Sequence, residues 1–146
     1  MKPSAGARHS TVSPCLMVES ISEELRFLEA VFGAKVRLLA GEKDRAVWQA
    51  QVQLGDTVLK IGRVHKQPVS GTGMLYVWID DVDAACARAV RKGASLISAP
   101  IDQPWGVREA GFRDPQGNMW WIGKKNRKPS NREVERRLTE QRRKRL

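Results

Sequence analysis

The hydrophobic and polar positions of this chain form one pattern that occurs twice. An apolar run closed by an acidic residue, at 14–20 and again at 75–81, opens each half. A helical stretch that ends at a glycine follows, with Gly33 in the first half and Gly93 in the second. Each half then closes on a turn and a strand. A repeat of about 60 residues is longer than a solenoid unit, so the pattern predicts two copies of a βαβββ module.

The first half is expected to place one helix between strands. Ser20 or Ser22 can cap this helix, and Gly33 suits the left-handed residue that ends it. The apolar residues of the helix recur at helical spacing and form one face, at Ile21, Leu25, Leu28 and Phe32. Strands are predicted at four ranges, Ser13–Val18, Lys35–Leu39, Ala46–Leu54 and Thr57–Ile61.

The second half repeats this order of elements. Asp81 or Asp83 can cap a helix that runs to Lys92 and ends at Gly93. Four residues of this helix are expected to face inward, Val82, Cys86, Ala89 and Val90. Strands are predicted at Met74–Ile79, Ser95–Ser98, Val107–Phe112 and Asn118–Ile122.

The composition is that of one soluble domain. The chain has 146 residues, of which 41% are hydrophobic and 29% charged, and this length is enough for one compact core. No apolar run approaches the roughly 18 residues that a membrane span needs, and the first residues lack the apolar stretch of a secretion signal. Cys15 and Cys86 have no metal-like spacing, so buried, reduced thiols and a cytoplasmic location are expected.

Positive charge is concentrated at the C-terminal end. Residues 124–146 hold 11 of the 26 Lys and Arg residues but 3 of the 16 acidic ones, so the rest of the chain is nearly neutral. Ser130 and Glu133 have the spacing of a helix capping box, and the apolar stripe formed by Val134 and Leu138 is thin. We therefore favour a solvated helical tail on the surface, with nucleic-acid binding through phosphate contacts as the alternative.

Several short motifs resemble a known family. The most specific is an Asp-Pro-x-Gly-Asn turn, whose proline presets φ and whose glycine accepts a positive φ. With the motifs around it, this turn resembles the vicinal oxygen chelate superfamily of glyoxalases, extradiol dioxygenases and bleomycin-resistance proteins, and most closely its small bleomycin-resistance-like members. The motifs are Val82–Ala85, Lys92–Ala94, Trp105–Gly106 and Gly111–Asn118.

The resemblance covers about residues 12–124 and implies an α+β fold. In that fold, two βαβββ modules form a curved mixed sheet around a cavity, and members commonly form homodimers. We accordingly expect one domain built from two modules, with a basic C-terminal helical tail. The expected parts are an N-terminal arm (1–12), module one (13–64), a linker (65–73), module two (74–124) and the tail (125–146).

The resemblance also implies where a metal site would lie. Metal enzymes of the superfamily carry His, Glu or Gln on the first and last strand of each module. The corresponding positions here hold no usual ligand; they are Ser13, Leu59 or Lys60, Met74 and Trp121. The two histidines, His9 in the arm and His65 in the linker, lie away from these positions. No metal and no other cofactor is therefore expected.

Strand alternation places apolar and aromatic residues on one face of module two, and the resemblance implies that this face lines the cavity. Tryptophan rings offer broad stacking surfaces for flat or cationic ligands, and polar groups near the mouth of the cavity could orient such a ligand. The predicted ligand-binding residues are Met74, Tyr76, Trp78, Trp105, Arg108, Met119 and Trp121. No catalytic residue is assigned.

Two functional hypotheses follow from these positions. The leading one is a metal-independent small-molecule binding protein that sequesters a flat, hydrophobic or partly cationic ligand, as an antibiotic-resistance protein would. The alternative is a lyase or isomerase of the glyoxalase or dioxygenase type, with a displaced divalent-metal site that uses His9, His65 or Glu109.

Overall fold

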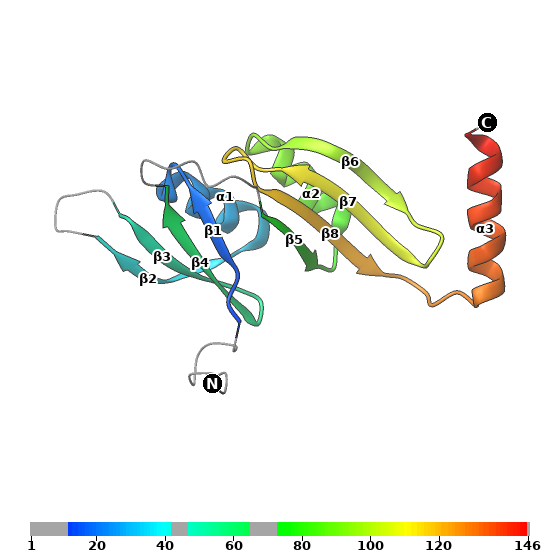
Figure 1. The fold of residues 1–146 in the computed structure, drawn as a ribbon, viewed down its shortest axis with the longest axis horizontal. Coiled ribbons are helices and arrows are strands. Elements are labelled where there is room, and N and C mark those ends of the chain that lie inside the picture. The colour runs from blue at the N-terminus through cyan, green and yellow to red at the C-terminus, as the bar shows by residue number, and fades with distance from the viewer. Residues whose placement is uncertain (1–11, 42–46, 65–72, 146) are drawn as a thin grey trace.

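The computed structural model describes residues 12–41, 47–64 and 73–145. These residues form two four-stranded sheets and three helices, and the α+β fold predicted from the sequence is confirmed (Figure 1). None of the helices in these ranges is long and apolar enough to cross a membrane. In chain order the elements are β1 (Cys15–Val18), α1 (Ile21–Phe32), β2 (Lys35–Ala40), β3 (Gln49–Leu54), β4 (Thr57–Arg63), β5 (Met74–Trp78), α2 (Val82–Arg91), β6 (Ser95–Asp102), β7 (Val107–Arg113), β8 (Met119–Lys125) and α3 (Asn131–Lys144).

The two modules have the same strand topology. The first sheet has the order β1-β4-β3-β2 and the second the order β5-β8-β7-β6, and in each the first strand of the module pairs in parallel with the last. The sheets lie next to each other along the long axis of the molecule (Figure 1). Among the residues described, no strand pairing joins one sheet to the other. The sheets curve without closing into a barrel.

Side-chain caps fix where the first two helices begin. The Ser20 hydroxyl accepts a hydrogen bond from the Glu23 backbone at 3.4 Å, and the Asp81 carboxylate accepts one from the Ala84 backbone at 3.0 Å. These bonds satisfy amide groups that the first turn of a helix leaves unpaired. Gly33 ends α1 with φ of 64°, the left-handed conformation expected of it.

Helices α1 and α2 join the modules through one shared core. The helix-facing side of each sheet is buried, and it includes Ile61 in β4 and Ile122 in β8. The ring of Phe32 at the end of α1 reaches the second module, where its centroid lies 5.1 Å from that of Trp120 and 6.3 Å from that of Phe112. Apolar burial therefore unites two sheets that share no backbone ladder.

The Asp-Pro-Gln-Gly-Asn turn is held by one buried carboxylate. One oxygen of Asp114 accepts hydrogen bonds from the backbone amides of Gln116 and Asn118, at 2.9 and 3.0 Å. The other oxygen accepts a bond of 2.8 Å from the indole nitrogen of Trp120. Gly117 has φ of 91°, as the turn requires. The turn thus fixes the largest fully buried side chain of the core.

Three details differ from the sequence prediction. Strand β6 continues to Asp102 rather than ending at Ser98, because register shifts along its pairing with β7 absorb the irregular pattern. Val90 is 44% exposed, since Ala85 rather than Val90 completes the inward face of α2. Cys15 is exposed and Cys86 is buried, so the prediction of two buried thiols was wrong for Cys15. Cys15 alternates with the core residue Leu16 and therefore points to the open face of its sheet.

A second carboxyl group, that of Glu24, is fully buried in α1. Neither of its oxygen atoms has a hydrogen-bond partner in the described part of the chain. Burial, together with the smaller effect of the negative charge of nearby Asp114, raises the pKa of Glu24 to about 9. Glu24 is consequently a neutral acid at physiological pH, at the place where module one meets the turn of module two.

Replacing Glu24 by Gln should flatten the pH dependence of stability between about pH 5 and pH 9. In this window native Glu24 keeps a proton that the unfolded chain, with a pKa near 4.5, has released, so the free energy of unfolding falls as pH rises. Glutamine cannot ionise. Urea unfolding midpoints across this range measure the slope. Glu29→Gln, on the exposed side of α1, is the matched control and should keep the wild-type slope; equal slopes for wild type and Glu24→Gln would contradict the raised pKa.

Candidate functional site

Strand register settles which positions of the two modules are equivalent. Lys60 lies opposite Cys15 in the first sheet, and Trp121 lies opposite Tyr76 in the second. The Ile-Gly pairs of β4 and β8 therefore match, which makes Lys60 the counterpart of Trp121. Leu59, the other candidate, is 3% exposed and faces the helices. Of the two alignments left open by the sequence, the one that uses Lys60 is confirmed.

The second sheet presents an aromatic face that no described element covers. This aromatic face consists of the residues of β5 and β8 that point away from the helices, and they alternate with buried Trp120 and Ile122. In β5 the exposed fractions are 62% for Met74, 42% for Tyr76 and 55% for Trp78. The five residues of the aromatic face are Met74, Tyr76, Trp78, Met119 and Trp121. Large apolar side chains that are exposed together are typical of surfaces that contact a ligand or another protein.

Glycines beneath the aromatic face let its rings lie flat on the sheet. A Cβ at Gly123 would collide with the hydroxyl of Tyr76, and a Cβ at Gly111 would come within 2.9 Å of the Trp121 ring. The two rings therefore occupy space that side chains would otherwise fill. The sequence pattern did not predict this role for either glycine, although Gly123 alternates with Trp121 and Gly111 lies opposite it.

Tyr76 is further held by a polar contact with Glu109. The Tyr76 hydroxyl donates a hydrogen bond of 2.9 Å to one Glu109 oxygen, and the Gln103 amide donates one of 2.9 Å to the other. Glu109 is 9% exposed. Burial and the bond to Glu109 raise the pKa of Tyr76 to about 12, so the phenol keeps its proton across the physiological range. Tyr76, Glu109 and Gln103 thus form a hydrogen-bonded cluster beside the aromatic face.

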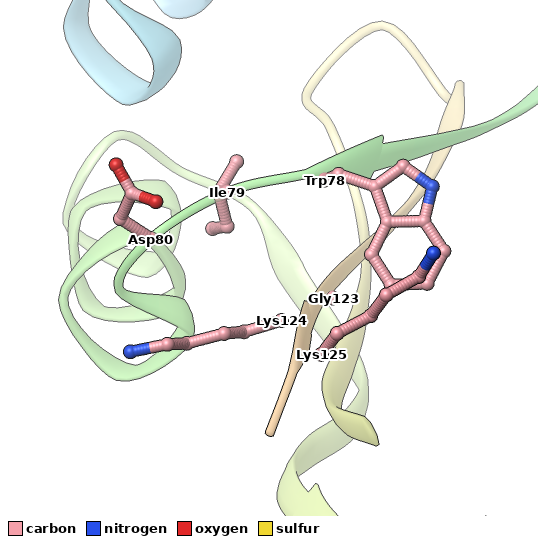
Figure 2. A pocket seen from close by; sticks show the side chains of 6 residues that line it. All are labelled: Trp78, Ile79, Asp80, Gly123, Lys124 and Lys125. Atoms are coloured by element: carbon pink, nitrogen blue, oxygen red, sulfur yellow. The ribbon is translucent and has the colours of Figure 1, made fainter. Parts of the chain in front are cut away.

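A pocket of about 420 Å³ adjoins the aromatic face at Trp78. The Lys125 ammonium lies 5.0 Å from the centre of the Trp78 ring, and the Tyr76 ring lies 4.8 Å from the same ring. Figure 2 shows Lys125 lying along the indole, while Lys124 extends toward the side of the pocket that holds Asp80. The pocket thus combines an aromatic wall with two cations and one carboxylate.

The remaining predicted ligand-binding residues lie elsewhere. Arg108 is next to Glu109 in β7 and points to the opposite side of the strand. It binds Asp83 of α2 at 2.7 and 2.8 Å and Asp102 of β6 at 3.2 Å. Arg108 therefore does not belong to the aromatic face. Its hydrogen bond lowers the pKa of the Asp83 carboxyl. Trp105 is 47% exposed in the turn between β6 and β7, beyond the end of the sheet where Lys125 pairs with Val107. Ligand binding by both residues stays a prediction.

The open face of the first sheet is mixed in character, with several polar groups and the exposed Leu38 of β2, which lies opposite Gln51. It carries Lys60, paired with Cys15 on one side and with Gln51 on the other, and Met17 and Gln49 flank the next position, Gly62. The equivalent positions of the second sheet hold rings. The two modules therefore have the same backbone but offer amide, amine and sulfur groups on one face and aromatic groups on the other.

The residues at the four metal-ligand positions do not fit a divalent cation. With the register known, these positions hold Ser13, Lys60, Met74 and Trp121. No group of three or more His, Cys, Asp or Glu side chains comes together in the described ranges. Both oxygens of Glu109 already accept hydrogen bonds. His9 and His65 lie outside the residues that the structure describes.

The topology and the turn at 114–118 agree with a comparison against family models. Residues 9–122 match the model described as the Glyoxalase/Bleomycin resistance protein/Dioxygenase superfamily. The chain belongs to this superfamily. TioX from Micromonospora sp. ML1, whose crystal structure is known, has the same glyoxalase-like fold, with a TM-score of 0.66 and 22% identity over 78% of this chain and 98% of TioX.

Sequence relatives do not assign an activity to the chain. An uncharacterized protein of Mycobacterium tuberculosis is 28% identical over 141 residues, which cover 89% of this chain and 83% of the relative. CFP32 of Mycobacterium bovis, named as a proposed glyoxylase, is 30% identical over 113 residues, which cover 73% of this chain and 41% of CFP32. The chain thus matches less than half of CFP32.

Replacing Gly123 by Ala should displace the Tyr76 ring. The new methyl group would take the place of the hydroxyl and break its bond to Glu109, which should lower the free energy of unfolding by about 1–3 kcal/mol. Urea unfolding measures this loss, and near-UV circular dichroism measures the movement of the ring.

The matched control for this substitution is Gly62→Ala in module one. There a Cβ would meet the sulfur of Met17 at 2.9 Å, and a flexible thioether can move aside. We expect a smaller loss of stability and an unchanged aromatic signal. An equal loss of stability in both variants would contradict the conclusion that Gly123 makes room for the Tyr76 ring.

Proposed function

We propose that this glyoxalase-superfamily protein binds a flat aromatic small molecule on the aromatic face of module two. The observation that carries the proposal is that exposed Tyr76 and Trp78 lie together with half-buried Trp121 on a face that the rest of the described chain leaves open. Stacking on such rings contributes about 0.5–1.5 kcal/mol per pair beyond the burial of area. Because glycines seat two of the rings, the face needs little rearrangement on binding, which lowers the entropy cost of association.

We also propose that a second copy of the chain completes the site. A flat ligand on an open sheet would leave its second side in water, whereas binding sites usually enclose most of the ligand surface. The open face of module one, with Lys60, Gln49 and Gln51, belongs to a sheet of the same strand topology, and no described element covers it. Pairing module one of one copy with module two of the other would bury both faces and give two equal sites.

The charges beside the aromatic face define two ligand classes to compare. Lys125 already places an ammonium over Trp78, so the ring tolerates a cation, and a cationic ligand would displace this lysine. An anionic group would instead meet Lys124 and Lys125, with Asp80 nearby. Two dyes of similar three-ring shape and opposite charge, 9-aminoacridine and anthracene-9-carboxylate, distinguish these cases.

Trp121→Ala should weaken the binding of such a dye by about tenfold, which corresponds to about 1.4 kcal/mol. The variant removes a stacking surface while the buried side of the sheet stays intact. Dye fluorescence anisotropy measures the affinity. Trp48→Phe changes an exposed tryptophan just before β3 in the other module and should leave the affinity within about twofold. If neither dye binds the wild-type protein at millimolar concentration, the proposed function is wrong.

The proposed pairing predicts a particle of twice the chain mass of 16.4 kDa. Tyr76→Glu, which adds a charge to the aromatic face, should shift the protein toward the single chain by desolvation of that charge. Sedimentation equilibrium over a dilution series measures the mass. Glu135→Lys on α3 adds a charge change away from both sheets and should leave the mass unchanged. A wild-type protein that sediments as one chain at about 100 μM would contradict the shared site.

The enzymatic alternative predicts a different result in elemental analysis. A lyase or isomerase with a displaced site would retain one divalent ion per chain, whereas the proposed binding protein would not. Protein purified without chelator therefore separates the two hypotheses, and a stoichiometric ion would favour the enzyme.

A further inference from the structure

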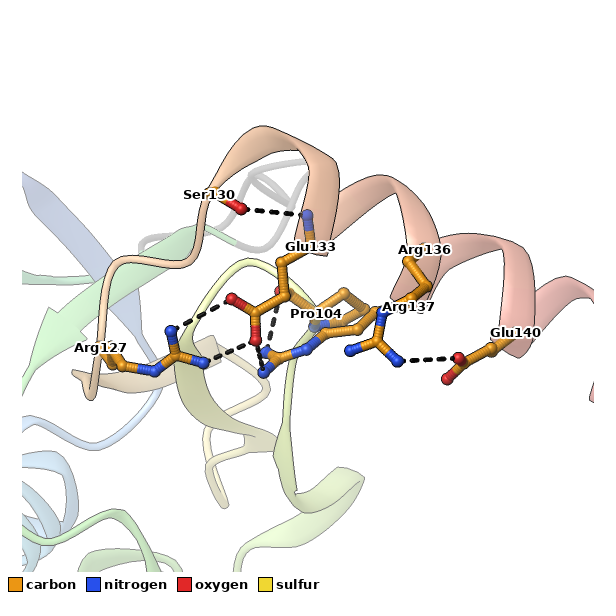
Figure 3. Close-up of polar contacts among 7 residues, drawn as sticks. All are labelled: Pro104, Arg127, Ser130, Glu133, Arg136, Arg137 and Glu140. Atoms are coloured by element: carbon orange, nitrogen blue, oxygen red, sulfur yellow. Dashed lines mark hydrogen bonds and ion pairs between the residues drawn. The ribbon is translucent and has the colours of Figure 1, made fainter.

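The beginning of α3 is fastened to the second sheet by a network around Glu133 (Figure 3). Arg127 donates two hydrogen bonds to the Glu133 carboxylate, at 2.6 and 3.1 Å, and Arg137 donates a third at 2.6 Å. Arg137 also donates to the Pro104 carbonyl at 3.3 Å, and the Ser130 hydroxyl caps the helix. The Glu133 carboxylate therefore holds Arg137, and Arg137 connects α3 to the turn between β6 and β7. Glu133 does not close a reciprocal capping box with Ser130.

The segment before α3 is fixed as well. The backbone of Arg127 passes so close to Gly106 that a Cβ there would collide with the Arg127 carbonyl. Pro129 is buried, and the Asn126 amide donates a hydrogen bond of 2.9 Å to the Gly106 carbonyl. The helix thus leaves the domain in a set direction, and it is a solvated helical tail, as the sequence predicts. Beyond its first turns α3 extends away from both sheets (Figure 1), and none of its residues is buried.

The outward side of α3 carries a row of arginines. Arg132, Arg136 and Arg143 are spaced by about one turn and two turns, so they lie on the same side of the helix over about 16 Å. All three are exposed, and the half-buried Val134 and Leu138 lie on a different side. Arg136 pairs with Glu140 at 3.3 Å, but a surface ion pair of this kind contributes little and opens readily. Further cations follow at the end of the helix, at Arg142, Lys144 and Arg145.

The composition of this arginine row fits phosphate groups. Residues 131–145 contain six Arg and one Lys against three Glu, and the guanidinium fork binds phosphate oxygens with two parallel hydrogen bonds. A membrane-surface helix would need a broad apolar face with large side chains, which Val134 and Leu138 alone do not supply. Duplex DNA carries one charge per about 1.7 Å of axis, so a 16 Å row spans several phosphates.

We propose that α3 binds the sugar-phosphate backbone of nucleic acid through Arg132, Arg136 and Arg143. The contact is independent of base sequence, because the row reaches phosphates and the described chain offers no base-reading helix in its place. Since such binding releases condensed counterions, it weakens steeply with salt. Because contacts fix the beginning of α3 on the domain, the bound nucleic acid would lie at a defined distance from the domain and its aromatic face.

The test compares two triple variants of the full chain with equal net charge. Arg132→Gln, Arg136→Gln and Arg143→Gln remove the row, whereas Lys35→Gln, Arg63→Gln and Arg91→Gln remove three exposed cations from the domain. The probe is a fluorescein-labelled 20-base-pair duplex of arbitrary sequence, and its anisotropy is followed in about 50 mM salt and over a salt series. Circular dichroism checks that both variants keep their helices.

We expect the arginine-row variant to lose at least tenfold in affinity and the domain variant to change by less than about twofold. The slope of log affinity against log salt should fall by about 0.9 for each row arginine removed. Three outcomes would overturn the proposal: no duplex binding by the wild type in low salt, equal losses in the two variants, or binding to phosphatidylserine vesicles without binding to the duplex. Because dye binding on the aromatic face is measured separately, this result does not depend on the proposed function.

Discussion

The buried Asp114 carboxylate is the contact on which the arrangement of the two modules depends. It closes the turn before β8 and holds the indole of Trp120, and this ring packs against Phe32 of the other module. A buried carboxylate is tolerated because three donors satisfy it. Glu24 approaches from module one without a donor of its own and remains neutral instead. Hydrogen bonds thus satisfy the Asp114 carboxylate, whereas the neighbouring Glu24 carboxyl keeps its proton.

Packing on one side of the sheets leaves the other side free for binding. The helices cover one face of each sheet and bury its large residues, so the alternate residues of the same strands remain in solvent. In module two these alternate residues are aromatic, and in module one they are amides, an amine and a thioether. The proposed binding function and the proposed pairing of two copies both follow from this division between faces.

Much of the fold could be predicted from local chemistry. Ser20, Asp81, Gly33 and the turn at 114–118 act through contacts a few residues long, so their residue types predicted them, with Ser22 and Asp83 left as alternatives for the two caps. The predictions that were wrong or left undecided concern contacts between residues far apart in the chain. The choice between Leu59 and Lys60 depended on register with β1, and the place of Arg108 depended on Asp83, which is 25 residues away in the chain. The anchoring of α3 likewise rests on Pro104 and Gly106, which no pattern within the tail indicates.

The absence of a backbone ladder between the sheets, within the described residues, has a consequence for how such a duplicated protein can diverge. A change of pleat or register in one sheet is not transmitted through a strand ladder to the other, because the modules meet through side-chain packing and a few side-chain hydrogen bonds, such as that from Arg88 to the Val31 carbonyl. Each copy of an ancestral module can therefore acquire its own chemistry on the open face while the common core is retained. The open face of module one carries glutamines where that of module two carries aromatic rings, although the two sheets have the same topology.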